Sequence, residues 1–328
     1  MEPLSILALE SIPRVGPKTI EKVFSLHPEF EPSKPADIVE VLKNSRNDFK
    51  NIPVPDIQDA IKSWNKANEI IQLSQKHNIR FASRYDLNYP RLLLKIPNPP
   101  FLLHVLGNIN ALNRDCIAIV GTRKPTDHGI SAARKLGAIL AKKGYVIVSG
   151  LAEGIDSAAH QGALDANGTT IAVLAHGLDK IYPAKNKELA NEIIKHGGAL
   201  VSEYSWGAKI FRNYFVARDR IQSGLSLGVI VVETGIEGGT MHTVKFCRDQ
   251  ERTLIVLKCP VKLCDNLKML GNNQLILDDQ ADLIIENQKD INLIINKLNH
   301  KKNSMWGYRT IKKSDSIRTY QMKFESSD

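Results

Sequence analysis

Short apolar runs alternate with helical patterns between residues 116 and 258, and this alternation constrains the fold more than any other feature of the chain. Strands separated by helices form parallel βαβ units, and right-handed crossovers bring the carboxyl ends of such strands to one edge of the sheet. The sequence therefore predicts an α/β domain with a mostly parallel sheet. The expected strands are residues 116–120, 146–149, 171–174, 199–202, 227–232 and 253–257, and the expected helices between them cover 130–140, 157–165, 188–195, 211–221 and 241–249.

Segments of different character follow one another along the chain. Residues 1–80 are predicted to form a small all-helical domain, because apolar residues recur at helical spacing, for example from 57 to 71. Residues 81–115 form a proline-punctuated connector that includes an entry strand near 101–107. Residues 116–300 form the α/β domain, and residues 301–328 are expected to be a basic, mostly disordered tail.

Residues 12–19 (IPRVGPKT) place a glycine-containing turn between two helical patterns, as in a helix-hairpin-helix segment. In such a segment the backbone N–H groups of the hairpin can hold a DNA phosphate. The same pattern also suits a plain helical hairpin that only packs against its neighbours. Both interpretations stay open on the sequence alone.

The chain of 328 residues has 44 Lys and Arg against 35 Asp and Glu, which gives a formal net charge of +9. This balance favours a polyanionic partner, although an ordinary basic cytosolic protein can have the same balance. The four cysteines show no Cys-x-x-Cys pair and no zinc-ligand spacing, which fits a reducing compartment. The amino terminus lacks a signal-peptide pattern and no apolar run reaches 18 residues, so we expect a cytoplasmic protein without a membrane span.

Glycine-bearing loops at the expected strand ends are candidate phosphate sites, because glycine allows a close approach of the backbone and arginine offers a bidentate fork. Gly121-Thr122-Arg123 follows the first strand, where the alternative is that Arg123 pairs with a carboxylate of its own domain. Ser149-Gly150 follows the second strand, and Asp156 is expected to cap the next helix. Gly238-Gly239-Thr240 forms a further anion nest at a helix start.

Two other segments combine cationic side chains with aromatic rings, a combination that suits a single nucleic-acid strand. One segment, residues 177–186, follows the third expected strand, and the alternative there is that Lys185 is simply solvated. The other spans residues 211–226, where rings at helical spacing can equally pack in the core. The candidate ligand contacts in these segments are Lys185 and Asn186, beside Tyr182, and Arg218, Arg220, Gly224 and Ser226.

Known patterns for catalysis are missing from the sequence. It contains no His-x-x-x-His pair, no Gly-x-Ser-x-Gly elbow and no aspartate cluster for two metals. His160, His176 and His242 lie near the loops and are interpreted as hydrogen-bonded structural residues. We therefore expect no enzymatic activity, no metal and no cofactor.

Blocks spread in order over residues 3–300 resemble the DNA-processing protein A family, also called DprA or Smf. The most specific block is residues 149–160 (SGLAEGIDSAAH). The other blocks are residues 89–108, 119–123 (IVGTR) with Gly129, 177–179 (GLD) with Tyr182-Pro183 and Asn186, 215–226 (FVARDRIQSGLS) and 271–276 (GNNQLI).

The resemblance implies an extended Rossmann-like fold, a mostly parallel sheet with helices on both faces, preceded by a small all-helical domain. It also implies a non-enzymatic protein that binds single-stranded DNA, acts as a homodimer and loads a RecA-type recombinase during natural transformation. Carried over to this chain, Arg123 and Lys185 would contact DNA phosphates. The loops at 149–150 and 224–226 would line the same pocket.

The chain departs from the family pattern at several places. Val216 and Asp219 stand where the family usually has Pro and Asn, and residues 233–243 carry Gly-Gly-Thr-Met-His-Thr in place of a Ser-Gly-rich turn. The winged-helix domain of many members is expected to be absent. These departures leave a second function open, a nucleotide-binding sensor of a defence system with the same fold. A third, a nucleoside monophosphate hydrolase, lacks its catalytic glutamate because Lys245 stands in that place.

Overall fold

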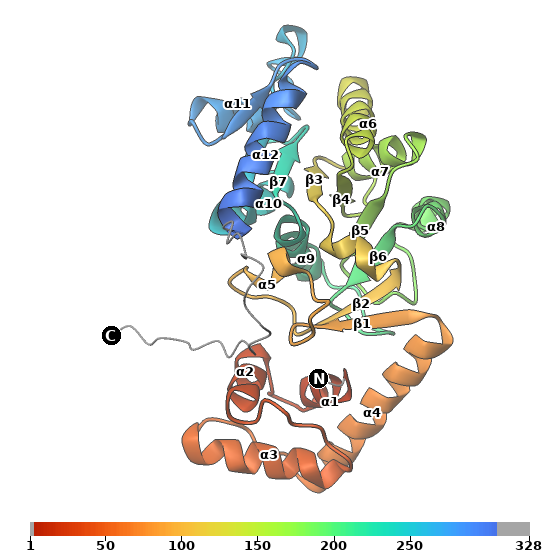
Figure 1. Ribbon diagram of the computed structural model, residues 1–328, viewed down its shortest axis with the longest axis vertical. Helices are drawn as coiled ribbons and strands as arrows, with labels where there is room; N and C mark the ends of the chain where they lie inside the picture. Colours follow the sequence, from red (N-terminus) through yellow and green to blue (C-terminus); the bar gives the residue numbers. More distant parts are fainter. Residues whose placement is uncertain (1–2, 307–328) are drawn as a thin grey trace, which may run out of the picture.

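Four helices precede the first strand in the computed structural model, which describes residues 3–306 (Figure 1). Three of them begin with proline, which is tolerated in the first turn because its fixed φ suits a helix and its missing N–H has no partner there. The apolar sides of all four helices meet in one core, which extends to Phe101 at the entry of the sheet. These helices are α1 (Pro3–Ser11), α2 (Pro17–Leu26), α3 (Pro35–Asp48) and α4 (Ile57–Lys76).

Within residues 3–306, nine strands form one sheet in the order β1-β2-β6-β5-β4-β3-β7-β8-β9. Neighbours from β6 to β9 are parallel, and β2 and β1 are added at one edge as antiparallel strands. The predicted α/β class is therefore confirmed. The strands are β1 (Ile79–Ser83), β2 (Leu102–Gly107), β3 (Cys116–Val120), β4 (Val146–Ser149), β5 (Thr170–Leu174), β6 (Ala199–Ser202), β7 (Gly228–Val231), β8 (Thr253–Leu257) and β9 (Leu283–Ile285).

Helices cover both faces of the sheet, because alternate strand residues such as Ile147 and Val148 enter different apolar cores. One core contains Val148 with side chains of α5 (Arg91–Leu94), α9 (Arg212–Leu225), α10 (Thr240–Asp249) and α11 (Leu270–Leu277). The other contains Ile147 with side chains of α6 (Asp127–Lys142), α7 (Ile155–Asp165) and α12 (Asp290–Trp306). Helix α8 (Lys187–Lys195) packs on the same face as α7.

The order of the strands reverses at β3, which lies between β4 and β7. The chain winds from β3 towards β6 in one direction, and from β7 towards β9 in the other. The loops that follow β3 and β7 therefore diverge at the carboxyl edge of the sheet. In an open α/β sheet such a switch point leaves a crevice for a ligand.

Some expected boundaries differ from the structure. The helix expected at 211–221 continues to Leu225, and α12 continues through residues 301–306, so the predicted disordered tail does not begin at residue 301. Its remaining part, residues 307–328, lies outside the described residues, and the division into domains stays a prediction. No disulfide joins the four cysteines, Cys116, Cys247, Cys259 and Cys264. None of the helices between residues 3 and 306 is both long and apolar enough to cross a membrane.

Candidate functional site

A cavity of about 840 Å³ lies at the switch point, between the loop after β3, the loop after β7 and the first turns of α9. Its size is in the range of small-molecule and cofactor sites. The structure brings half of the predicted ligand contacts together in its wall. These are Gly121, Thr122, Arg123, Arg218, Gly238, Gly239 and Thr240.

The loop after β3 is fixed by contacts that its sequence pattern did not reveal. A Cβ atom at Gly121 would lie 2.5 Å from Ile155 Cγ1, so only glycine fits there. The N–H of Thr122 donates to the carbonyl oxygen of Glu233 at 2.7 Å. The fully buried carboxylate of Glu233 accepts hydrogen bonds from the backbone N–H of Thr126, at 2.8 Å, and from its hydroxyl. The ends of β3 and β7 are thereby tied together beneath the cavity.

Three exposed cationic side chains line the cavity: Arg123, Lys124 and Arg212. None of them forms an ion pair with any residue between 3 and 306. The guanidinium of Arg123 instead lies over the ring of Phe215, 5.2 Å from its centroid. The alternative in which Arg123 pairs with a carboxylate is thus not what the structure shows. Its charge is available to an anion.

The side chain of Asn272 in α11 holds the loop after β7 in place by hydrogen bonds to its backbone. Its side-chain N–H groups donate to the carbonyl oxygens of Leu257, at 2.9 Å, and Val232, at 3.0 Å. Its side-chain oxygen accepts from the N–H of Thr234 at 2.9 Å. Because Asn272 is fully buried, these bonds fix the path of the loop that leads to Gly238.

Helix α10 begins at Thr240, with Gly239 as its N-cap and no side chain capping the first turn. The N–H of Gly238 is occupied by Gly235, whose carbonyl oxygen accepts it at 3.0 Å. A helix amino terminus without a side-chain cap leaves N–H groups for an anion. The lining of the cavity by Gly239 and Thr240 agrees with the predicted anion nest, while the binding itself stays a prediction.

One buried arginine, Arg218, lines the cavity together with the carboxylates of Asp156 and Asp219. Arg218 is only 5% exposed, and its Nη1 donates to the carbonyl oxygen of Val173 at 2.5 Å. Its Nε lies 3.2 Å from Asp219 Oδ1. Burial raises the pKa of Asp219 to about 6, against the attraction of Arg218. Burial also raises the pKa of Asp156, again opposed by Arg218.

Several predicted contacts at the strand ends are occupied by the protein itself. The hydroxyl of Ser149 donates to the carbonyl oxygen of Ile119 at 2.7 Å, and the amide of Asn186 donates to that of Leu151 at 2.8 Å. Gly150 lies under Arg218, where a Cβ atom would be 1.9 Å from Nη1. These residues shape the wall and do not line the cavity.

Lys185 is exposed but also does not line the cavity. Its Nζ lies 2.6 Å from Glu153 Oε2 in an ion pair. Glu153 follows directly on Ala152, a residue of the cavity wall. The lysine is thus held beside the cavity by a carboxylate in an exposed pair.

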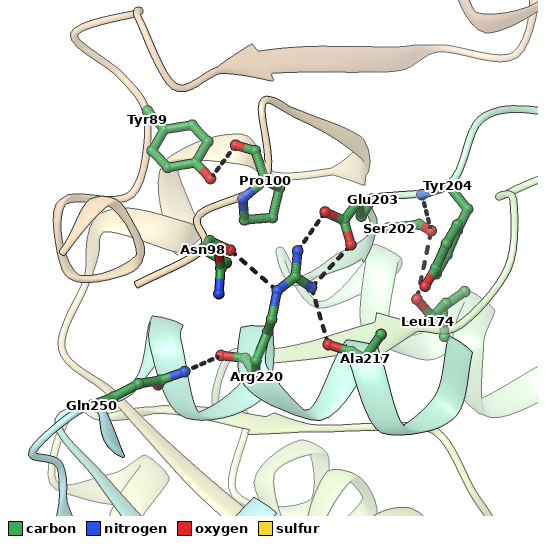
Figure 2. A network of polar contacts seen from close by, with 10 residues as sticks. All are labelled: Tyr89, Asn98, Pro100, Leu174, Ser202, Glu203, Tyr204, Ala217, Arg220 and Gln250. Carbon is green, nitrogen blue, oxygen red and sulfur yellow. Dashed lines mark hydrogen bonds and ion pairs between the residues drawn. The ribbon is translucent and has the colours of Figure 1, made fainter. Parts of the chain in front are cut away.

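Figure 2 shows that Arg220 belongs to a different network. Its two terminal nitrogens lie 2.9 and 2.5 Å from the carboxylate oxygens of Glu203, and its Nε donates to the carbonyl oxygen of Asn98 at 3.1 Å. The backbone oxygen of Arg220 also accepts a hydrogen bond from Gln250 at 3.0 Å. Arg220 therefore joins α9 to the connector before β2 and does not line the cavity, so the structure does not bring this candidate ligand contact together with Arg123.

Gly224 and Ser226 lie at the carboxyl end of α9. The helix has 14 residues and is about 21 Å long, and its first turns lie at the cavity. A Cβ atom at Gly224 would lie 2.6 Å from a methyl carbon of Leu93, and the hydroxyl of Ser226 donates to the carbonyl oxygen of Gln222 at 2.8 Å. The prediction that these two residues line the same pocket is wrong, because a helix between parallel strands ends at the opposite edge of the sheet.

Sequence reasoning missed residues that share one face of α9. Side chains three, four and seven residues apart lie on the same side of a helix, and this periodicity could have separated them from Arg220. Asp156 is also not the expected N-cap: it is the second residue of α7 and accepts from the N–H of Ala152 at 3.2 Å. The missed cavity residues on this face of α9 are Arg212, Phe215, Asp219 and Gln222, and Lys124 was missed in the loop after β3.

The three histidines occupy different positions. His160 is fully buried, and its Nδ1 lies 2.7 Å from the hydroxyl oxygen of Thr170. His176 is also buried, with its Nδ1 2.9 Å from the carbonyl oxygen of Gly177. Both have the structural role that the sequence predicts. His242 differs, because it is exposed and lines the cavity.

Comparison with known proteins gives a family for these features. A family model described as DNA recombination-mediator protein A matches residues 80–296, more than half of the chain. Protein Smf from Synechocystis sp. is 42% identical over 207 residues, which make up 61% of this chain and 52% of that protein. The chain therefore spans about half the length of this relative.

The fold is shared by solved structures, of which two are described by their similarity to this chain. The X-ray structure of DNA processing protein A from Streptococcus pneumoniae superposes with a TM-score of 0.71 and 28% identity, covering 89% of this chain and 97% of that one. DNA processing protein A from Helicobacter pylori, described for its single-stranded DNA binding mode, gives a TM-score of 0.59 and 30% identity over 67% of this chain and 98% of that one.

Proposed function

Because the chain belongs to the DNA recombination-mediator protein A family, we propose that it binds single-stranded DNA in the cavity at the switch point. The observation that carries the proposal is the set of three exposed cations at the cavity, Arg123, Lys124 and Arg212, none paired with a carboxylate between residues 3 and 306. A related protein from Helicobacter pylori is described for its single-stranded DNA binding mode, which supports the same ligand class here.

The cavity offers each part of a DNA strand a matching surface. Arg123 provides a planar fork for a phosphate, and the uncapped start of α10 at Gly239 provides backbone donors. Two rings stand at the same opening, Tyr182 and Phe215, with centroids 5.9 Å apart and planes tilted by 62°. Bases stack on such rings whatever their sequence. Lys185 joins the phosphate contacts when a strand displaces it from Glu153.

We further propose that the protein works without catalysis, as a homodimer in the cytoplasm that hands single-stranded DNA to a RecA-type recombinase. Family membership supports a mediator role. The hydrolase alternative needs a carboxylate where Lys245 stands, and Lys245 does not line the cavity. A nucleotide sensor would use the same cavity, so the choice between strand and mononucleotide rests on the binding experiment.

The test is a fluorescence-anisotropy titration with labelled oligo-dT, run beside a panel of nucleoside mono-, di- and triphosphates. Arg123→Glu is expected to weaken oligo-dT binding by about tenfold or more, because a repulsion replaces a bidentate phosphate contact. Lys143→Glu is the matched control, since Lys143 is exposed and follows the carboxyl end of α6 at the opposite edge of the sheet. Tight binding of a mononucleotide together with no affinity for oligo-dT would overturn the proposal.

The mediator role is tested separately. Recombinase filament formation is followed on single-stranded DNA that is already coated by a single-strand binding protein. The wild-type chain is expected to speed this step and Arg123→Glu to lose the effect. An unchanged filament rate with wild type, at concentrations that saturate the DNA, would contradict the mediator role while leaving DNA binding in place.

A further inference from the structure

A second cavity, of about 500 Å³, lies at the opposite edge of the sheet from the cavity at the switch point. It is formed around Thr253, the first residue of β8, by the carboxyl end of α10 and the carboxyl half of α12. The cavity at the switch point lies instead at the carboxyl ends of β3 and β7, and the two cavities have no lining residue in common. The volume of the second cavity is also in the range of small-molecule sites.

Helix α12 presents a cationic side to the second cavity. Its lining residues are spaced three, four and seven positions apart, which places them on one side of the helix: Lys297, His300, Lys301 and Ser304. Other residues hold the helix at this edge of the sheet. Lys302 Nζ lies 2.7 Å from Asp115 Oδ2, just before β3, and Leu298 is fully buried. The positions of Lys297 and Lys301 are therefore set by contacts that neither lysine makes.

Two arginines line the other side of the second cavity. Arg248 is exposed in the last turn of α10, and its Nη1 donates to the carbonyl oxygen of Gln280 at 2.8 Å. Arg252 is only 3% exposed, and its Nη2 donates to the carbonyl oxygen of Leu92 at 2.8 Å. Burial lowers the pKa of Arg252 to about 10, because its charge is poorly solvated. A negative charge in the cavity would offset this cost.

The carboxylates of the second cavity do not neutralise its lysines or Arg248. Asp282 accepts the N–H of Leu254 at 2.7 Å, which ties it to β8, and Glu251 is exposed. Arg248, Lys297 and Lys301 form no ion pair with any residue between 3 and 306. The lining has four lysine and arginine side chains against two carboxylates, so its net charge is positive.

This lining suits phosphate groups better than a nucleic-acid strand. Cationic side chains converge on one cavity from two helices, and Thr253 and Ser304 add hydroxyl groups that can donate to an anion. Among residues 3–306, no phenylalanine, tyrosine or tryptophan lines the cavity, so none of these rings offers a face to a base. A strand is held by a cationic groove together with such rings. A compact anion needs only the cations and the hydroxyl groups.

We propose that the second cavity binds a compact polyphosphate, such as the triphosphate group of a nucleotide, with Arg248, Lys297 and Lys301 as its phosphate contacts. The proposal does not rest on the binding of single-stranded DNA, because the cavity at the switch point lies at the other edge of the sheet. The same chemistry can come from inorganic triphosphate, from a nucleoside triphosphate or from neighbouring phosphates of a nucleic acid, and the experiment separates these sources.

The test is an isothermal titration of the full chain with inorganic triphosphate, without divalent cations and at an ionic strength of about 0.1 M. It uses the Arg123→Glu variant, so that the cavity at the switch point contributes little binding. Adding Lys297→Glu is expected to weaken the affinity about tenfold or more, because a repulsion replaces an attraction. Adding Lys143→Glu is the matched control, since Lys143 is exposed at the same edge of the sheet and does not line the second cavity.

Further ligands identify the source of the phosphates. Orthophosphate is expected to bind at least about tenfold more weakly than triphosphate, because it reaches fewer cations. A nucleoside triphosphate is expected to match inorganic triphosphate, and oligo-dT is expected not to displace it. If oligo-dT displaces the triphosphate, the cavity belongs to a nucleic-acid path and the proposal is wrong. It is equally wrong if Arg123→Glu alone abolishes triphosphate binding, or if adding Lys297→Glu leaves the affinity unchanged.

Discussion

At the scale of single residues, the ion pair between Lys185 and Glu153 keeps a candidate phosphate contact beside the cavity. Its ion pair with Glu153 is exposed on both sides, and such pairs contribute no more than about 1 kcal/mol. A DNA phosphate has to compete with Glu153 for the lysine and also meets the repulsion of the carboxylate. The pair therefore lowers the affinity for DNA without blocking it.

We expect Glu153→Gln to tighten oligo-dT binding about two- to fivefold at low salt, because it frees Lys185 and removes a negative charge from the rim. The anisotropy titration measures this change. Glu192→Gln is the matched control, since Glu192 forms a similar exposed pair with Lys195 on α8. Unchanged or weaker binding by Glu153→Gln would show that Lys185 is not a phosphate contact.

Asp219 links the cavity to the pH dependence of stability. Burial raises its pKa to about 6 from the ordinary value of 3.8, although Arg218 opposes the shift. The folded state thus binds this proton more tightly than the unfolded state. The stabilising contribution is fully present below pH 3.8 and is lost as the pH rises through about 6.

Asp219→Asn, which does not titrate, is therefore expected to be about as stable as wild type at pH 4 and more stable at pH 8. A shift of about two pKa units corresponds to a gain of about 1–3 kcal/mol at the higher pH. Urea unfolding of both proteins at the two pH values measures the difference. An equal difference at both pH values would contradict the raised pKa.

The residue types in the sequence predicted which region of the sheet carries the cavity better than they predicted which residues line it. The glycine-bearing loops indicated the edge of the sheet at which the cavity lies, and the glycines at 121, 238 and 239 line it. Ser149 and Asn186 follow the same pattern but turn their polar groups to buried carbonyl oxygens. The direction of a short polar side chain depends on the neighbouring strand, which one local sequence does not reveal.

At the scale of elements, helix α9 explains which arginines reach the cavity. Arg218 and Arg220 are two residues apart, and positions two apart on a helix do not face the same way. Arg218 reaches β5 and the cavity, while Arg220 reaches Glu203 and the connector. The spacing of the helix was available in the sequence. The side that faces the ligand was not, because it depends on which strands lie beneath α9.

Asn272 acts on a different element, since it fixes the ends of β7 and β8 from α11. Asn272→Ala is expected to lower the free energy of unfolding by about 2–3 kcal/mol, because it leaves the buried N–H of Thr234 and two carbonyl oxygens without partners. Asn273→Ala, which removes one exposed bond to the carbonyl oxygen of Cys264, is expected to change it by less than about 1 kcal/mol. Urea unfolding compares the two, and equal losses would contradict the role given to Asn272.

At the scale of the whole molecule, the alternation of strands and helices predicted the parallel part of the sheet and the edge at which the cavity lies. It did not predict how the four amino-terminal helices attach. They pack on the antiparallel strands β1 and β2, and Arg84 holds the junction with its guanidinium 3.7 Å from the centroid of Phe101 and 3.3 Å from Glu21 of α2. Such contacts join residues far apart in the chain, and no local periodicity records them.

The net charge of +9 belongs to the whole chain, so DNA affinity could come from diffuse attraction or from the cavity alone. The salt dependence separates the two, because each phosphate contact with a single strand contributes a slope of about −0.7 in a plot of log affinity against log salt. With contacts from Arg123, Lys124 and Arg212, we expect a slope of about −2 for wild type. Arg123→Ala should make it shallower by about 0.7, and Lys143→Ala should leave it unchanged. Equal slopes for both variants would place the attraction on the molecule as a whole, since a diffuse field does not distinguish one lost cation from another.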